Sequence, residues 1–237
     1  MSHEHHEHSR RMPDLGPLTT ALRYDYQNQS LLTEALSHRS AGSTNYERLE
    51  FLGDGLLNFV IAAALYRMHP ELNEGSLSRL RASLVRESTL ADIARDLKLS
   101  EYLYMGQGEL RSGGFNRDSI LSDVVESLIG ACYMEAGFDT AEALVLRLFD
   151  SRLHNLPEVT SLKDPKTQLQ EWLQGQQLER PVYEVVGKEG KAHELQFTVT
   201  CAVASSEKTV RATASSRRKA EQTAAAEMLE LLKSDIG

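Results

Sequence analysis

The 237-residue sequence predicts two domains, an all-α domain followed by a small α+β domain of order α-β-β-β-α. Residues 15–153 show helical periodicity almost throughout, without the alternation of β-strands. Residues 154–162 (H-N-L-P-E-V-T-S-L) have the composition of a linker. The periodicity changes after this segment, which predicts a separate domain at 163–234. Residues 1–14 are expected to form a disordered tail.

Turn-forming residues divide the first domain into helices. Loops or caps are expected at His69-Pro70, at 73–75 (N-E-G) and in the glycine-rich 106–114 stretch. The expected helices cover residues 17–23, 30–37, 45–68, 76–95, 98–103, 119–135 and 139–150.

The helix expected at 45–68 carries three carboxylates close together, in E-R-L-E-F-L-G-D. At about 100° per residue, Glu47, Glu50 and Asp54 fall within about 60° of one another on one face. Like charges at this spacing destabilise an isolated helix, so the face indicates a cationic neighbour, either a basic partner or a metal ion. The opposite side, where we expect the core, carries Leu49, Leu52 and Leu56.

A second acidic face follows in I-L-S-D-V-V-E-S-L-I-G-A, where Asp123 and Glu126 share one side of a helix. Gly130 lies on the same side, one turn further along, and its missing side chain would let a neighbouring helix approach. Two such helices would bring four carboxylates together, which suits Mg²⁺ or Mn²⁺. The alternative is two solvated amphipathic faces, but both segments are otherwise largely apolar. The residues expected to point into the core are Val125, Leu128, Ile129 and Cys132.

The second domain is predicted to contain a three-stranded antiparallel sheet with two helices on one face. Its last helix begins with S-S-R-R-K-A-E, where cations oppose the helix dipole. Arg217, Arg218 and Lys219 suit this position if a phosphate backbone lies across that helix end; the alternative is three solvated basic residues. The expected elements are a helix at 163–174, strands at 182–186, 193–204 and 208–214, and a helix at 216–233.

Composition gives weaker clues. The net charge of −8 does not indicate a nucleic-acid binder, although local patches decide such binding. Cys132 and Cys201 lie in apolar runs and are expected to be buried thiols in a reducing cytoplasm. We expect no membrane association, because no stretch approaches the ~20 apolar residues of a membrane span. The histidine-rich start could bind a divalent metal, but it has the composition of a disordered polar tail.

These motifs together resemble the bacterial ribonuclease III family, over roughly residues 15–233. The family signature E-R-L-E-F-L-G-D, followed by a small residue, matches 47–55, and a second block, D-x-x-E-A/S-L-I-G, matches 123–130. The C-terminal part resembles a double-stranded RNA-binding domain in D-P-K-T-Q-L-Q-E, in A-H-E-L-Q-F and in S-S-R-R-K-A-E-Q.

The resemblance implies a Mg²⁺-dependent endoribonuclease, with Mn²⁺ as a substitute, that cleaves double-stranded RNA in the cytoplasm. It implies a homodimer with one site for each strand, and products with 5′-phosphate and 3′-hydroxyl ends and short 3′ overhangs. The expected role is processing of ribosomal RNA precursors and other structured transcripts. Two rival functions are a non-catalytic RNA-binding protein with a decayed nuclease domain and a metal-dependent phosphohydrolase acting on nucleotides.

The resemblance also assigns roles in the first domain. The metal-binding positions are Glu50, Asp54, Asp123 and Glu126, of which Asp54 and Glu126 are expected to be catalytic. Glu126 corresponds to the acid that bridges metal and scissile phosphate. Supporting roles fall to Glu47, for the site and the dimer, to Phe51, at the dimer interface, and to Glu74. Glu74 would assist the water shell of a metal, with helix capping as an equal alternative.

In the second domain, the resemblance implies a shape-reading mode that spans about 16 base pairs. The first helix would reach a minor groove and its 2′-hydroxyls, and the helical spacing independently puts the four residues concerned on one face: Thr167, Gln170, Glu171 and Gln174. His193 would enter the next minor groove. The phosphates between the two grooves would be bound by Ser216, Arg217 and Arg218.

The sequence departs from the family pattern in two places. Gly55 replaces the usual serine or alanine, which we expect to lower helix stability by about 0.5–1 kcal/mol without a chemical effect. Residues 212–214 read A-T-A where the family has G-x-G, a change that bears on the turn presenting Arg217 and Arg218.

Overall fold

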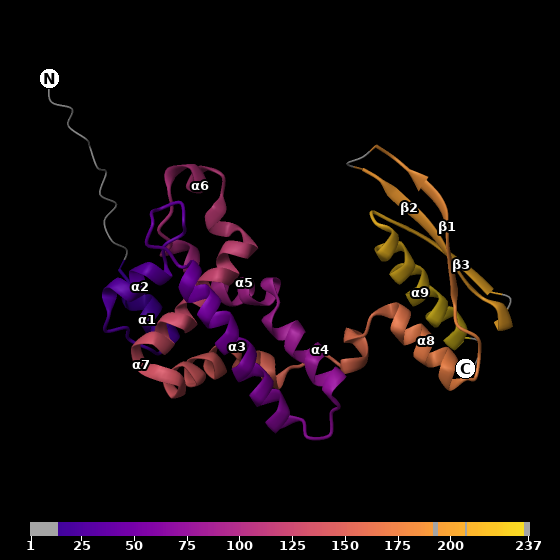
Figure 1. The fold of residues 1–237 in the computed structure, drawn as a ribbon, viewed down its shortest axis with the longest axis horizontal. Coiled ribbons are helices and arrows are strands. Elements are labelled where there is room, and N and C mark those ends of the chain that lie inside the picture. The colour runs from indigo at the N-terminus through magenta and orange to yellow at the C-terminus, as the bar shows by residue number, and fades with distance from the viewer. Residues whose placement is uncertain (1–13, 192–193, 207, 235–237) are drawn as a thin grey trace. The chain divides into compact units, whose positions relative to one another are not determined.

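The protein was analysed as a computed structural model that describes residues 14–191, 194–206 and 208–234. The chain divides into two compact units, Met1–Pro157 and Glu158–Gly237 (Figure 1). The division lies within the segment 154–162. The architecture confirms the expected fold class, a helical unit followed by an α-β-β-β-α unit.

The first unit is entirely helical among its described residues, apart from an isolated bridge between Ser37 and Tyr104. Its elements are α1 (Gly16–Leu22), α2 (Gln29–Ala35), α3 (Glu47–Met68), α4 (Glu74–Val85), α5 (Glu87–Asp96), η1 (Leu99–Glu101), α6 (Gln107–Arg111), η2 (Gly114–Asn116) and α7 (Asp118–His154).

The helices α3 and α7 pack together at the centre of this unit, and two glycines set their separation. A Cβ atom on Gly53 would lie 1.8 Å from the carbonyl oxygen of Glu126. One on Gly130 would lie 2.2 Å from the carbonyl oxygen of Leu49. The two backbones therefore touch, and any side chain at either glycine would force them apart. This confirms the close helix approach expected at Gly130.

Several expected boundaries in the first unit were wrong. Residues 76–95 form two helices, because Arg86 has an extended backbone (φ −68°, ψ 150°) between α4 and α5. The expected helix at 98–103 is only the short turn η1, and the glycine-rich 106–114 loop contains α6. By contrast, the two helices expected at 119–135 and 139–150 are confirmed, because Gly137, with a positive φ of 78°, interrupts the segment labelled α7 between them.

The core face of α3 also differs from the expected one. Leu49 is buried, but Leu52 and Leu56 are only half-buried, whereas Gly53 and Leu57 are buried against the core. The buried face lies next to the acidic face instead of opposite it. Hydrophobic spacing alone missed this, because a glycine contributes no apolar signal even where two helices make their closest contact.

By length and composition, α3 is the one helix in the described part of the chain that is apolar enough to cross a membrane. Our expectation that no segment approaches such a composition was therefore wrong. The same helix buries one side against α7, as a helix in the core of a folded domain does, and it carries the charged Glu47, Glu50 and Asp54.

The second unit contains one antiparallel sheet of order β1-β2-β3. The pairing of β1 with β2 has an irregularity between Val185 and Gly187. Residues 212–214 pair regularly with β2, so the departure from the family's G-x-G is accommodated in a strand. The elements are η3 (Val159–Leu162), α8 (Pro165–Gly175), β1 (Val182–Glu189), β2 (Gln196–Val203), η4 (Ala204–Ser206), β3 (Lys208–Ala214) and α9 (Arg217–Ser234).

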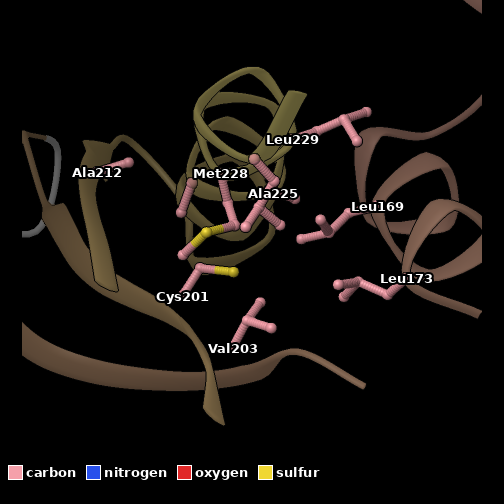
Figure 2. Packing of buried hydrophobic residues seen from close by; sticks show 10 residues of the cluster. Leu169, Leu173, Cys201, Val203, Ala212, Ala225, Met228 and Leu229 are labelled. Atoms are coloured by element: carbon pink, nitrogen blue, oxygen red, sulfur yellow. The ribbon is translucent and has the colours of Figure 1, made fainter. Parts of the chain in front are cut away.

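One buried cluster joins both helices to the same face of this sheet (Figure 2). Leu169 and Leu173 of α8 converge with Met228 of α9 on Cys201 and Val203 of β2. Alternate residues of β2 point inward, as expected for a strand with one covered face. Both cysteines are free and buried, as the sequence predicts.

Candidate metal centre and RNA-binding face

The contact between α3 and α7 brings together carboxylates that lie far apart in the sequence. Glu50 of α3 and Asp123 and Glu126 of α7 each offer a carboxylate oxygen, and these oxygens lie within 4.8 Å of one another. The approach at Gly53 and Gly130 occurs beside these side chains, because Glu126 supplies the carbonyl that faces Gly53. Two motifs read separately from the sequence therefore meet in one acidic group.

Asp54 borders this group without belonging to it. Its side chain is exposed, and its Oδ1 accepts a hydrogen bond of 2.7 Å from Nδ2 of Asn58. Its charge nevertheless reaches Glu126, because after burial it contributes most to the raised pKa of that side chain. The structure thus places three of the four expected ligands together and the fourth at their edge.

Burial and mutual repulsion make the acidic group hard to ionise. Burial, followed by the charges of Asp54, Asp123 and Glu50, raises the pKa of Glu126 from 4.5 to about 8. Burial, followed by the charge of Asp123, raises the pKa of Glu50 from 4.5 to about 7. The pKa of Asp123 is also raised, chiefly by burial.

In the part of the chain that the structure describes, the carboxylates of this acidic group have no basic side chain paired with them. Within the described ranges, none of these carboxylates forms an ion pair with a lysine or arginine side chain. Their donor atoms are all carboxylate oxygens, which are hard ligands of the kind that Mg²⁺ and Mn²⁺ prefer. A divalent cation therefore fits the donor set and would relieve the repulsion that raises the pKa values.

One hydroxyl group holds Asp123, and sequence reasoning missed it. The hydroxyl of Tyr46 donates to Oδ2 at 3.3 Å, whereas the hydroxyl of Ser122, 3.4 Å from Oδ1, donates to the carbonyl oxygen of Ser119 at 2.8 Å. The ring of Tyr46 lies against His38, with centroids 5.8 Å apart. Nothing in the local pattern distinguishes Tyr46 from an ordinary core aromatic, although it directly precedes the E-R-L-E-F-L-G-D motif.

The expected supporting residues lie outside the group of three. Glu47 is half-exposed and pairs with Arg39 at 3.7 Å. Glu74 is the first residue of α4, and its Oε1 accepts a hydrogen bond of 2.9 Å from the hydroxyl of Ser78. The side chain that caps α4 is Asn73, so Glu74 contributes a favourable charge to the first turn and makes no capping bond.

An apolar surface begins directly beside the acidic group. Phe51 is 82% exposed and Phe59 is 60% exposed, which is unusual for large aromatic side chains. Phe59 also contacts Phe138 of α7 edge-on, with centroids 5.9 Å apart. A groove that includes Asp54 is lined by these side chains and their neighbours Leu52, Gly55, Leu56 and Tyr133.

In the second unit, α8 has one exposed polar face. The opposite side of the helix carries the buried Leu169 and Leu173. Glu171 forms an ion pair with Lys163. The exposed face contains all four residues expected to reach a minor groove, Thr167, Gln170, Glu171 and Gln174.

At the start of α9, ion pairs and hydrogen bonds hold part of the basic cluster of Arg217, Arg218 and Lys219 in place. The hydroxyl of Ser216 accepts from the backbone N–H of Lys219 at 3.2 Å. Glu221 is 8% exposed, and its carboxylate pairs with Arg217 at 2.8 Å and with Lys166 of α8 at 2.6 Å. Arg218 is exposed. His193 lies outside the described residues.

A helical unit with a half-buried acidic group suited to divalent metal, joined to an α-β-β-β-α unit with a basic helix end, has the parts expected of a metal-dependent nuclease that binds nucleic acid. Known families match both parts. Residues 28–153 match the family described as Ribonuclease-III-like, and residues 165–232 match the double-stranded RNA binding motif.

Relatives that match nearly the whole chain carry the name of the same family. Ribonuclease 3 of Vibrio cholerae is 50% identical over 220 residues, which cover 93% of this chain and 98% of that protein. Ribonuclease 3 of Shewanella baltica is 51% identical, over 93% of this chain and 97% of that protein. A solved structure of the nuclease domain of ribonuclease III from Campylobacter jejuni is 42% identical, with a TM-score of 0.57, over 58% of this chain and 97% of that one.

The chain belongs to the ribonuclease III family. It is therefore an endoribonuclease that acts on double-stranded RNA, and its family membership implies use of a divalent metal ion. The resemblance inferred from the two acidic motifs and the C-terminal pattern is confirmed.

Proposed function

We propose that the protein is a Mg²⁺-dependent homodimer that cleaves double-stranded RNA to 5′-phosphate and 3′-hydroxyl ends with short 3′ overhangs. The observation that carries this proposal is the acidic group of Glu50, Asp123 and Glu126, with oxygens within 4.8 Å and pKa values raised by burial. We further propose, from the family resemblance, that its substrates include ribosomal RNA precursors and other structured transcripts.

The chain supplies a negatively charged cradle for the metal. Glu50, Asp123 and Glu126 would hold it from the two packed helices, and the exposed Asp54 would complete the set at the open edge. When bound, such an ion would supply Lewis acidity and would lower the pKa of a water molecule at the site. Mg²⁺ suits the all-oxygen donors, and Mn²⁺ can substitute because it accepts the same ligands. Glu47 and Glu74 would act from outside the group, on the charge around it.

The second unit would supply affinity for the duplex. The exposed polar face of α8 would lie in a minor groove, while Ser216, Arg217 and Arg218 would bind phosphates beside it. His193 would enter the next minor groove. Phosphate contacts release counterions, so binding should weaken markedly as the salt concentration rises.

The apolar groove beside Asp54 supports a homodimer. Phe51, Phe59 and Phe138 expose aromatic surface that a second copy of the helical unit could cover. One of the Campylobacter jejuni structures is described as showing flexibility in a region involved in dimer formation. Sedimentation analysis tests this proposal: Phe51→Ser should shift the protein from dimer to monomer, whereas a dimeric variant would contradict it. The free, buried thiols suit a cytoplasmic protein.

The catalytic proposal is tested by replacing Glu126 with glutamine, which keeps the shape of the side chain and removes its charge. We expect Glu126→Gln to leave a defined RNA duplex uncut in Mg²⁺ while retarding it in a gel as strongly as the unaltered protein. Asp139→Asn is the matched control, because Asp139 is an exposed carboxylate on the same helix. Continued cleavage by Glu126→Gln would refute the proposed site. Mapping the ends of the products tests the proposed 5′-phosphates and 3′ overhangs.

A further inference from the structure

Tyr46 connects the two helices that carry the acidic group. It directly precedes α3, and its carbonyl oxygen accepts the backbone N–H of Glu50 at 2.9 Å. Its hydroxyl crosses to α7 and donates to Oδ2 of Asp123 at 3.3 Å. One residue is thus bonded through its backbone to a candidate ligand on α3 and through its side chain to a candidate ligand on α7.

The ring of Tyr46 has little freedom to move. The residue is 3% exposed, and its backbone N–H donates to the carbonyl oxygen of Ser37 at 2.9 Å. His38 packs against the ring, and its Nδ1 lies 2.7 Å from the hydroxyl oxygen of Ser40. The hydroxyl group is therefore held at a fixed place beside Asp123.

A carboxylate without such a partner rotates over a broad range about its last torsion angle, because that torsion has only shallow preferences. In Asp123, Oδ2 accepts the hydroxyl of Tyr46, whereas the hydroxyl of the neighbouring Ser122 donates to the carbonyl oxygen of Ser119 at 2.8 Å. A carboxylate oxygen has more than one lone pair, so both oxygens of Asp123 keep acceptor capacity for a cation. The hydroxyl of Tyr46 thus restricts the orientation of the carboxylate without blocking it.

We propose that Tyr46 is a positioning residue for the metal centre, whose hydroxyl fixes the Asp123 carboxylate in the orientation that binds the divalent ion. This inference rests on the metal site proposed above and names the residue that preorganises it. Outer partners that orient metal ligands commonly change metal affinity by about 10–100-fold when they are removed.

Tyr26 provides a matched control within the same unit. It is 1% exposed, and its hydroxyl donates to the backbone carbonyl of Leu128 on α7 at 2.7 Å. Tyr26→Phe and Tyr46→Phe therefore each remove one buried hydroxyl that bonds to α7. They differ in the acceptor, since only Tyr46 bonds to a carboxylate of the acidic group. If the loss of a buried hydroxyl changes metal binding only by destabilising the protein, the same change should appear in both variants.

The experiment measures Mn²⁺ binding to the full-length protein without RNA, by the paramagnetic resonance signal of free Mn²⁺, alongside thermal unfolding. We expect Tyr46→Phe to raise the dissociation constant for Mn²⁺ about 10-fold, and Tyr26→Phe to leave it unchanged. In RNA cleavage, Tyr46→Phe should need a higher Mg²⁺ concentration but approach the unaltered rate at saturation. Asp123→Asn serves as the variant that removes the ligand itself.

The outcomes separate the two proposals. If Asp123→Asn loses Mn²⁺ binding and Tyr46→Phe binds like the unaltered protein, the role of Tyr46 is overturned and the site stands. If Asp123→Asn also binds Mn²⁺ normally, the site and the role of Tyr46 are both overturned. An equal loss of affinity in Tyr46→Phe and Tyr26→Phe would show a general structural effect and would likewise overturn the role of Tyr46.

Discussion

Removing one charge from the acidic group should stabilise the metal-free protein, in a way that depends on pH. Glu126 has a pKa of about 8 in the folded protein, compared with an ordinary value of 4.5. The folded state therefore holds this proton more tightly than the unfolded state does. Its favourable contribution is complete below pH 4.5 and is lost as the pH rises through about 8. Glu126→Gln keeps the neutral form at every pH.

The magnitude follows from the two pKa values. At about 1.36 kcal/mol for each pH unit, the change from 4.5 to about 8 sets an upper limit of about 5 kcal/mol for Glu126. Because this side chain is partly open to water, screening lowers the effect, and we expect about 2 kcal/mol at pH 8. In a domain of this size, that corresponds to a rise in melting temperature of about 4–8 °C. At pH 5, only about half a unit above the ordinary pKa of 4.5, the expected difference falls to a few tenths of a kcal/mol.

Thermal unfolding in the presence of a chelator measures this effect, by circular dichroism at pH 5 and pH 8. The chain has a single tryptophan, Trp172 in α8, so its fluorescence reports the unfolding of the second unit and should not change. Asp139→Asn again controls for the loss of one exposed charge. Equal stabilisation of Glu126→Gln at both pH values, or none at pH 8, would refute the electrostatic reasoning.

Three further predictions concern packing and RNA binding. Gly53→Ala should destabilise the first unit by about 3 kcal/mol or more and abolish cleavage, because the new Cβ would meet a carbonyl oxygen at 1.8 Å. Gly55→Ala, with open space around the new Cβ, should instead stabilise the same helix by about 0.5–1 kcal/mol in urea unfolding. Unchanged stability of Gly53→Ala would contradict the close contact between α3 and α7. Arg217→Ala with Arg218→Ala should weaken duplex binding and lower the slope of log affinity against log salt by up to about 2, and unchanged affinity at physiological salt would contradict phosphate binding. The pKa of Glu221 is lowered, first by Lys166, so its stabilising effect is present above the ordinary carboxyl pKa and is lost in acid. Glu221→Gln should therefore lower the stability reported by Trp172 fluorescence by about 1–3 kcal/mol at pH 7, with a smaller difference near pH 3; a difference independent of pH would exclude the ion pairs as its cause.

Local patterns in the sequence were sufficient to identify both halves of the acidic site. Glu50, Asp123 and Glu126 could be assigned to helix faces because the helical period is fixed by backbone geometry, whatever surrounds the helix. The same reasoning predicted the order α-β-β-β-α and the exposed face of α8. The break at Arg86 was missed because a polar residue at the surface fits a continuous helix and a turn equally well.

The sequence by itself determined which residues share a face and, through its motifs, the family of the protein. Only the tertiary structure decided which faces meet, because that depends on how closely two backbones approach at Gly53 and Gly130. It also placed Asp54 at the edge of the group, joined Lys166 to Glu221 and brought the Tyr46 hydroxyl to Asp123. Hydrogen bonds between side chains distant in sequence leave no periodic signal along the chain, so they emerge only once the helices have packed.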